Sequence, residues 1–474
     1  MKMITSKTTV TLLIIFFKIS VASIAQNYPD NPWGEEWEHV YDGLDQSTQL
    51  QVQDKQNVLI INSNIHDVHG AKNALEIENC KNVLIINNTI SGHRFEGHGN
   101  ALQIRYGSEN VIIENNEIFD CDGTGISTAG SSTVCCPHDN PVLGCIIRGN
   151  IIHDIGKYPD PVGNSPKHGM YIKAQDVLIE DNIVYNSYDG QGLSVRSTGI
   201  VRGNKVWNCK NWPFAYWPQK EGGPSDKLII ENNVFYQDGN YDGPLSPSGI
   251  LVISNSNGFK FNNFVVRFNT LVRFKDAAHT RQMLFMATET YSNVKVYGNI
   301  LIDELPEGPK HFRGEEDCSY LDKNFTSTSL EGFKDADSRD FRLTPSHPAI
   351  GYATGVQEEF PSSDREGNPR TPASIDAGAY QLAEDNVVTS LDPELENDML
   401  IYPNPVTTDQ GVTIQLNESA RYNELSVYSI DGRVLQTLSL TDESEFQLKG
   451  LMSGMYVITF KGPRQSTQSK LIVK

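Results

Sequence analysis

The most constraining feature of this sequence is a phrase that recurs nine times between residues 58 and 302. Each copy has a short apolar run, a polar pair that usually contains Asn, and a second apolar pair, as in VLIINNTI and LIIENNVF. Successive copies lie 22 to 36 residues apart, which is typical of a stacked repeat, and the alternation of apolar positions indicates strands rather than helix pairs. The aligned position is Ser63, Asn88, Asn116, Asn150, Asn182, Asn204, Asn233, Asn269 and Asn299.

The repeated Asn predicts a ladder along the stack. Asn tolerates the left-handed backbone conformation of a tight turn, and its side-chain amide can hydrogen-bond the amide one coil away. A second strand accompanies the phrase, in LEIE, LQIR, MYIK and LSVR. We therefore expect a solenoid of stacked coils with an asparagine ladder.

The NNxI phrase, together with the HGMYI and GQGLSV phrases before it, resembles the right-handed parallel β-helix proteins of the pectate-lyase-like superfamily. The resemblance covers roughly residues 45 to 302. It implies an all-β chain built on a right-handed parallel β-helix solenoid. It favours no single activity, because many reactions use this scaffold.

The C-terminal end of the chain has a different pattern. LIYPNPV, LSVYSIDGRVL, LKGLMSGMYVITF and KLIVK follow one another as short alternating strands. In this order they resemble the C-terminal sorting domains of cargo of the type IX secretion system of Bacteroidota, which implies a small β-sandwich recognised by the secretion machinery. A carbohydrate-binding sandwich is the alternative.

Composition divides the rest of the chain. The first residues combine lysines, an apolar stretch and a small-residue cleavage site, as a secretory signal does. An uncapped solenoid would expose unpaired strand edges, so closing segments are expected at both ends. The predicted parts are a signal peptide (1–25), an N-terminal cap (26–47), the β-helix (48–317), a closing segment (318–382), an acidic linker (383–398) and the sorting domain (399–474).

These parts predict a monomeric protein that crosses the periplasm and the outer membrane to reach the cell surface or the medium. No stretch after the signal has the roughly 20 apolar residues of a membrane span. The net charge of -20 argues against nucleic acid as a partner, because phosphates are bound by basic surfaces.

Side chains that point outward from the solenoid decide its function. Because side chains alternate along a strand, the second and fourth residues of LEIE, LQIR, MYIK and LSVR should face outward. One predicted outward column is Gln51, Glu76, Gln103, Ser127, Tyr171 and Ser194, and the other is Gln53, Glu78, Arg105, Ala129, Lys173 and Arg196.

A basic stripe within the second column predicts an acidic polysaccharide as the ligand. Coils are about 4.8 Å apart, so Lys173 and Arg196 should stand side by side, with Arg105 two coils earlier. Adjacent like charges are unfavourable unless an anion lies among them. A polymer with repeated carboxylates or sulfates would supply that anion.

The same stripe could perform β-elimination from a uronate, which needs a cation for the carboxylate and a base for the neighbouring proton. Arg196 would favour the neutral, basic form of the Lys173 amine, and Arg196 or Arg105 could hold the carboxylate in a bidentate fork. His168 is a candidate acid or base, or else a turn residue. Resemblance to β-helix polysaccharide lyases implies Lys or Arg bases, often with bound calcium.

Further side chains near the stripe are candidates for substrate binding. Lys167 could instead be a solvated charge. The aromatic residues of WNCKNWPFAYWPQ could stack on sugar rings or form a buried patch, with Trp207 assigned to the core. The substrate-binding candidates are Gln103, Arg105, Lys167, Tyr171, Trp212, Tyr216 and Trp217.

Two other functions stay open. Asp122 and Asp189 occupy matching Asp-Gly turns with one coil between them, about 9.6 Å apart by coil spacing, near the carboxylate separation of an inverting glycoside hydrolase. The same Asp-Gly pairs can be plain turns, or acidic loops that hold calcium. The third function is a non-catalytic glycan-binding or adhesin solenoid.

Overall fold

A computed structural model of the chain describes residues 28–129, 141–157, 167–217, 227–239, 248–254, 263–277, 281–286, 293–382, 399–402, 406, 411–416, 424–429, 434–440, 445–451, 454–461 and 466–473. The chain divides into two compact units, residues 1–383 and 384–474. The predicted signal peptide and acidic linker lie outside the described residues.

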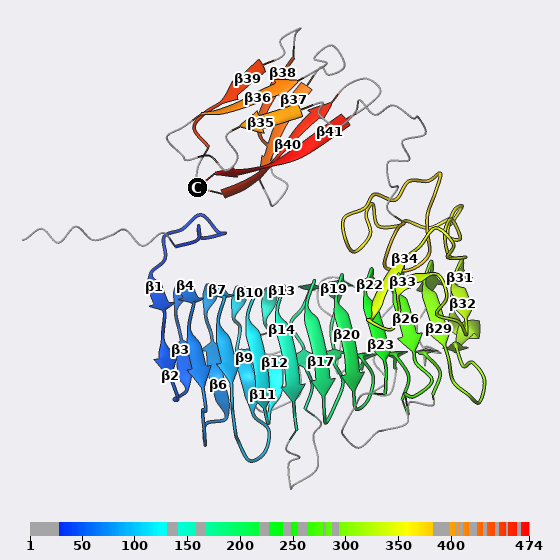
Figure 1. Ribbon diagram of the computed structural model, residues 1–474. Coiled ribbons are helices and arrows are strands. Elements are labelled where there is room, and N and C mark those ends of the chain that lie inside the picture. The colour runs from blue at the N-terminus through cyan, green and yellow to red at the C-terminus, as the bar shows by residue number, and fades with distance from the viewer. Residues whose placement is uncertain are drawn as a thin grey trace, which may run out of the picture. The chain divides into compact units, whose positions relative to one another are not determined.

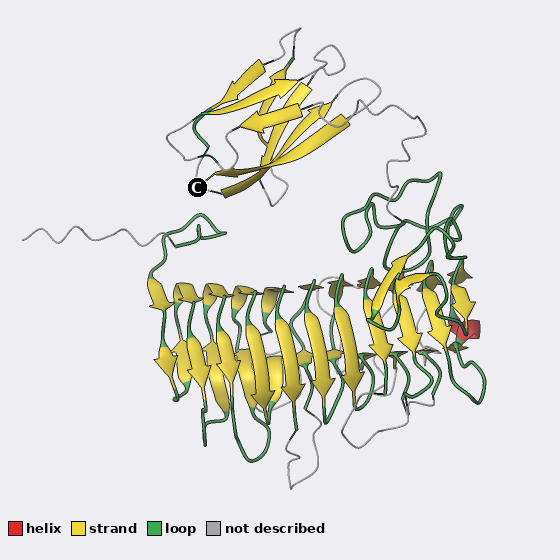
Figure 2. Ribbon diagram, viewed as in Figure 1, coloured by secondary structure: helices red, strands yellow, loops and turns green. Residues whose placement is uncertain are grey.

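The first unit is a parallel β-helix, as predicted, with three long parallel sheets (Figures 1 and 2). Sheet A contains β1 (His39–Asp42), β4 (Gln56–Ile61), β7 (Lys81–Ile86), β10 (Glu109–Glu114), β13 (Leu143–Arg148), β16 (Val177–Glu180), β19 (Gly199–Arg202), β22 (Leu228–Glu231), β25 (Phe264–Arg267), β28 (Val294–Tyr297) and β31 (Tyr320–Asp322). Sheet B contains β2 (Asp45–Gln46), β5 (Asn64–His66), β8 (Thr89–Ser91), β11 (Glu117–Cys121), β14 (Ile151–Ile155), β17 (Ile183–Ser187), β20 (Lys205–Cys209), β23 (Val234–Gln237), β26 (Thr270–Arg273), β29 (Ile300–Asp303) and β32 (Phe325–Ser327). Sheet C contains β3 (Leu50–Gln53), β6 (Asn73–Glu78), β9 (Asn100–Arg105), β12 (Thr124–Ala129), β15 (Met170–Ile172), β18 (Leu193–Val195), β21 (Phe214–Tyr216), β24 (Leu251–Ile253), β27 (Leu284–Met286) and β30 (Phe312–Arg313).

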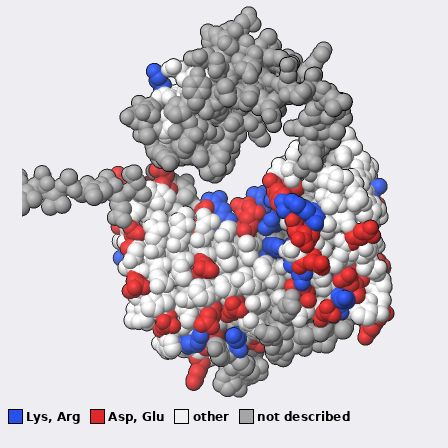
Figure 3. Space-filling model, in the orientation of Figure 1, with Lys and Arg blue, Asp and Glu red and all other residues white. Residues whose placement is uncertain are grey.

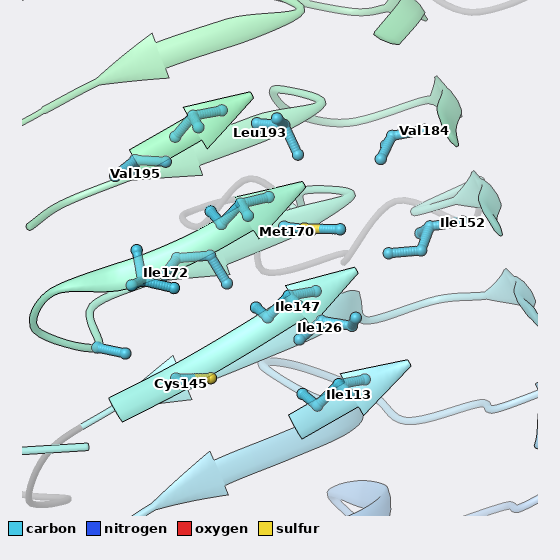
Figure 4. Close-up of a cluster of buried hydrophobic side chains, with 14 of the residues drawn as sticks. Ile113, Ile126, Cys145, Ile147, Ile152, Met170, Ile172, Val184, Leu193 and Val195 are labelled. Carbon is cyan, nitrogen blue, oxygen red and sulfur yellow. The ribbon is translucent and has the colours of Figure 1, made fainter. Parts of the chain in front are cut away.

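Each coil visits sheets A, B and C in turn, and every strand pairs with its counterpart one coil away. Strand pairing begins at β1 and continues to β32, so coils include residues that the sequence assigned to the two closing segments. The core is one column of aliphatic side chains from all three sheets, for example Ile147, Ile152 and Met170 (Figure 4). Alternate residues of each strand supply this column, which leaves the other residues on the outer walls.

The predicted asparagine ladder is present. From Ser63 to Asn299, each backbone N–H donates to the side-chain oxygen of the Asn in the next coil, at 2.9 to 3.1 Å, and the ladder continues to Asn324. The left-handed conformation was assigned to the wrong residue. It belongs to the position before each ladder Asn, such as Asn87 and Asp181, while the ladder residue itself turns inward and is buried.

A charge ladder lies on the outer wall of sheet A. Strand pairing places acidic and basic residues alternately at one position of six successive coils, in the order Glu114, Arg148, Glu180, Arg202, Glu231 and Arg267. Ion pairs join them two by two, at 2.7 to 2.8 Å. Charges of opposite sign are likewise interspersed across the face shown in Figure 3, so the acidic excess forms no single patch there.

Stacked rings line the outer wall of sheet B. Their centroids are 4.6 to 5.3 Å apart, in the order Phe119, His153, Tyr185, Trp207 and Tyr236. Trp207 therefore lies outside the core, contrary to the prediction, because the preceding Val206 takes the inward position.

Both ends of the β-helix carry segments that pack against its walls. Trp33 and Trp37 cover an apolar row on sheet A that includes Leu59. The C-terminal segment, with η1 (Glu315–Asp317), β33 (Phe333–Asp335) and β34 (Asp340–Leu343), packs Phe341 on Tyr236 of sheet B. Among the described residues, no helix has the length and apolar character needed to cross a membrane.

The second unit is built from two antiparallel sheets, which agrees with the predicted β-sandwich. One sheet has the order β35 (Met399–Tyr402), β36 (Val412–Leu416) and β39 (Glu445–Leu448). The other has the order β38 (Val434–Ser439), β37 (Glu424–Ser429), β40 (Gly454–Lys461) and β41 (Ser466–Val473).

Candidate functional site on the outer wall of sheet C

The outer wall of sheet C carries the two side-chain columns that strand alternation predicted. Strand pairing aligns the first column from Gln51 through Tyr171 to Ser194, and extends it to Ala215, Val252 and Phe285. In the second column, Lys173 and Arg196 follow the ends of β15 and β18, which are neighbouring strands. The predicted cations therefore share one wall.

Lys173 and Arg196 meet at a single aromatic ring. The Lys173 Nζ lies 4.8 Å from the centroid of the Tyr171 ring, and the guanidinium carbon of Arg196 lies 5.0 Å from the same centroid. The His168 ring stacks on Tyr171, with centroids 5.3 Å apart and planes within 10°. These four residues are called the Tyr171 cluster below.

His168 is held neutral in this cluster. Its side chain is 3% exposed, and its Nδ1 accepts a hydrogen bond of 3.0 Å from the backbone N–H of Gln191. Burial holds the His168 pKa well below its usual range, and the positive charges of Arg196 and Lys167 act in the same direction. An accepting Nδ1 leaves the proton on Nε2, so His168 offers a hydrogen-bond donor and no free lone pair for a base.

The sequence left open that Lys167 is a charge exposed to solvent, but the structure buries it. It is 3% exposed, and its Nζ donates to the carbonyl of Gly97 at 2.7 Å and lies 3.3 Å from His98 Nδ1. Its ammonium therefore fastens the loop before β9. A role of Lys167 in substrate binding stays a prediction from sequence.

Arg105 and Gln103 belong to a polar network on the earlier coils. Arg105 forms ion pairs with both Glu76 and Glu78, the latter at 3.2 Å. Gln103 is buried, accepts from Asn100 at 2.8 Å, and donates to two backbone carbonyls. Arg105 therefore has two carboxylate partners already, so it is less suited to hold a substrate carboxylate than the sequence suggested.

The three predicted aromatic contacts occupy different environments. Tyr216 is fully buried in the core, edge-on to Phe264 at 4.9 Å, so it cannot contact a polysaccharide. Its inward direction follows from alternation in β21, which the sequence interpretation did not apply to this strand.

Trp212 and Trp217 form an apolar patch on the outer wall instead. Trp212 is 5% exposed and packs on Ala215 and Val252, while Trp217 and Phe285 are only partly buried at its edge. Phe285, which the sequence analysis missed, could have been found from the alternation in LFM. The Trp217 carbonyl accepts a hydrogen bond from Arg196 at 3.1 Å, which joins this patch to the Tyr171 cluster.

The two aspartates of the alternative site lie in turns between sheets B and C. Asp189 Oδ1 pairs with Lys210 at 3.0 Å, and its Oδ2 accepts the Lys167 N–H at 3.2 Å. Burial raises the Asp122 pKa, although the nearby Arg94 opposes this. The Asp122 carboxyl therefore holds its proton more readily than a free one does, whereas both oxygens of Asp189 have partners.

A calcium site remains a prediction from sequence. Over the described parts of the chain, no group of three or more His, Cys, Asp and Glu side chains is arranged to hold a metal ion.

Comparison with known families agrees with both units. Residues 39–158 and 138–301 match the right-handed β-helix region, which amounts to more than half of the chain. The chain belongs to the right-handed β-helix family. Residues 400–474 of this β-helix protein match the secretion system C-terminal sorting domain. The protein is therefore cargo of the type IX secretion system, which delivers it to the cell surface or the external medium.

Individual relatives are more distant. Beta-agarase A of Zobellia galactanivorans is 35% identical over 86 residues, which are 18% of this chain and 15% of the agarase. Pectate lyase Pel9A is 12% identical with a TM-score of 0.38, over 72% of this chain and 86% of the lyase. The A-module of a mannuronan C-5 epimerase from Azotobacter vinelandii is 13% identical with a TM-score of 0.36, over 61% and 86%. The Dettilon tailspike protein is 14% identical with a TM-score of 0.31, over 61% and 62%. Likeness at this level assigns no activity.

Proposed function

We propose that this secreted β-helix protein acts on an acidic polysaccharide and cleaves it by β-elimination at the Tyr171 cluster. The observation that supports this most is the convergence of Lys173 and Arg196 on one Tyr171 ring, at 4.8 and 5.0 Å. Both positive charges therefore border one ring on the wall, and an anion bound beside that ring would be attracted to each of them. A uronate carboxylate is the anion that we propose.

Each step of the elimination has a group in the cluster. Arg196 pairs with the substrate carboxylate and stabilises the negative charge that develops on it. Lys173, once it has given up its own proton, takes the proton from the carbon beside the carboxylate. The electrons of that C–H bond form a carbon–carbon double bond, and the bond from the next carbon to the glycosidic oxygen breaks.

The leaving oxygen must gain a proton. The hydroxyl of Tyr171, on the ring that both cations contact, would donate it, and the Lys173 ammonium would then return a proton to Tyr171. No water is consumed, so the products are one unsaturated uronate and one ordinary chain end. Neutral His168 supports the Tyr171 ring by stacking without adding a third positive charge.

Hydrolysis is the second candidate function. Burial raises the Asp122 pKa, which is the direction that favours a general acid. Asp189 would have to exchange its contact with Lys210 for a water molecule to act as the base. We rank this function second for that reason.

The test is to incubate the secreted chain with uronate and sulfated polymers and to follow ultraviolet absorbance and reducing ends. Elimination yields the absorbing double bond, and hydrolysis yields reducing ends without it. Lys173→Ala is expected to lower turnover about 10²- to 10⁴-fold, as loss of a general base does. Lys81→Ala, at an exposed lysine on sheet A, is the control that should keep full activity.

Near-normal turnover of Lys173→Ala would refute the proposed site. Loss of activity in Asp122→Asn with hydrolytic products would favour the second candidate. A polymer that is retained on an affinity gel but never cleaved would make the protein a glycan-binding module.

A further inference from the structure

The wall of sheet C differs on the two sides of the Tyr171 cluster. On the N-terminal side, Glu76 and Glu78 both form ion pairs with Arg105, so these three side chains together carry one excess negative charge. Arg105 keeps 21% of its side chain exposed and Glu78 keeps 19%, so a polymer lying along the wall would meet both. A second uronate is repelled there.

On the C-terminal side the wall is apolar and aromatic. The outward positions of β21, β24 and β27 are Ala215, Val252 and Phe285. Trp217 and Phe285 are partly buried beside them, which leaves part of each residue exposed. Phe285 lies three coils after β18, or about 14 Å along the solenoid axis. A polymer held at Arg196 therefore continues over uncharged aromatic surface.

We infer that the wall binds one uronate at the Tyr171 cluster and uncharged, hydroxyl-bearing sugars on the C-terminal side of it. This inference rests on the proposed function, and it narrows the substrate to a heteropolysaccharide in which neutral sugars flank the uronate. A homopolymer of uronates would place a carboxylate against Glu76 and Glu78 on one side and against apolar rings on the other.

Affinity measurements test this inference without relying on cleavage. The secreted chain, with Lys173→Ala to prevent turnover, is titrated with homopolymers, polygalacturonate and alginate, and with polymers in which uronates alternate with uncharged sugars, such as hyaluronan and a uronate-containing bacterial heteropolymer. The best heteropolymer is expected to bind at least tenfold more tightly than either homopolymer.

Variants on the aromatic surface identify the subsite. Trp217→Ala is expected to weaken heteropolymer binding about tenfold, the loss of one aromatic contact, and to leave homopolymer binding unchanged. Trp217→Phe should restore most of the affinity. Phe285→Ala gives the same readout if Trp217→Ala fails to fold, and Trp207→Phe, on sheet B, is the control.

The outcomes separate this inference from the function it depends on. Homopolymers that bind as tightly as heteropolymers, or aromatic variants with unchanged affinity, overturn the inference even if uronates are eliminated. Tight heteropolymer binding with no elimination by the native chain overturns the proposed function and supports the subsite. No binding to any polymer overturns both.

Discussion

Replacing Asn182 by Ala should destabilise the β-helix more than its small change in size suggests. The Asn182 side chain is fully buried in the middle of the ladder. Its Oδ1 accepts from the backbone N–H and from the side-chain amide of Asn150, at 3.0 and 2.9 Å. Its Nδ2 donates to the carbonyls of Ile147 and Glu180 and to Asn204 Oδ1, at 2.9 to 3.0 Å.

The loss of stability depends on which hydrogen bonds the partners of Asn182 retain after the substitution. The Asn150 side-chain amide retains two carbonyl acceptors, and Asn204 Oδ1 still accepts the backbone N–H of residue 182. The Asn150 backbone N–H loses its acceptor inside the core, which costs about 1–3 kcal/mol. The other lost hydrogen bonds and the void add roughly as much again. We expect a loss of about 3–5 kcal/mol in the free energy of unfolding.

Urea unfolding followed by tryptophan fluorescence measures this loss. All five tryptophans, at positions 33, 37, 207, 212 and 217, lie in the first unit, so the signal reports the β-helix and not the sorting domain. Asn64→Ala is the control, because Asn64 is exposed and makes one side-chain contact, with Asp45 at 2.9 Å. That control should change stability by about 0.5 kcal/mol or less.

A loss of less than about 1 kcal/mol for Asn182→Ala, or equal losses for the two variants, would refute the reasoning. It would mean that coil stacking is held by strand pairing and core packing alone, and that water or a neighbouring group replaces the missing amide.

Two other predictions concern charge and pH. Glu180→Lys places three positive charges in a row with Arg148 and Arg202, so it should destabilise the β-helix by about 1–2 kcal/mol at low salt and by less at 0.5 M salt. The control Glu180→Gln should lower the free energy of unfolding by a smaller amount at either salt concentration. A loss in urea unfolding that does not depend on salt would contradict this prediction. Burial lowers the His347 pKa to about 4, and Nδ1 accepts the N–H of Ala349. The unfolded chain binds a proton at His347 below about pH 6.5, whereas the folded chain does so only below about pH 4. The stability that comes from keeping His347 neutral is therefore complete above pH 6.5, and it falls by roughly 3 kcal/mol between pH 6.5 and pH 4. His347→Gln should flatten stability across that interval, and an unchanged slope would show that other groups cause it.

The architecture could be predicted from local sequence because each coil repeats the same physical requirement. An apolar residue at every second strand position fills the core, and a ladder Asn such as Asn233 satisfies the turn of the neighbouring coil. Strand alternation also placed Lys173, Tyr171 and Arg196 on one wall, because parity along a strand and register between neighbouring coils are both local properties.

The predictions were wrong at positions where strand alternation was not applied, and at turns whose backbone conformation had to be predicted from residue type alone. Tyr216 was grouped with Trp212 and Trp217 by proximity in sequence, although alternation directs it into the core. The left-handed residue was placed one position late because Asn is common at both positions of the pair, as at Asn87 and Asn88.

The sequence alone determined that this chain forms a β-helix with a sorting domain and that Lys173 and Arg196 share a wall. Only the tertiary structure decided the electrostatic state of the other candidates. The Lys167 ammonium is bound by the Gly97 carbonyl, 70 residues earlier, and His168 is kept neutral by burial and by a backbone donor 23 residues later. The ionisation of such groups depends on burial and on partners brought close by loops of irregular length, and no periodic pattern encodes those contacts.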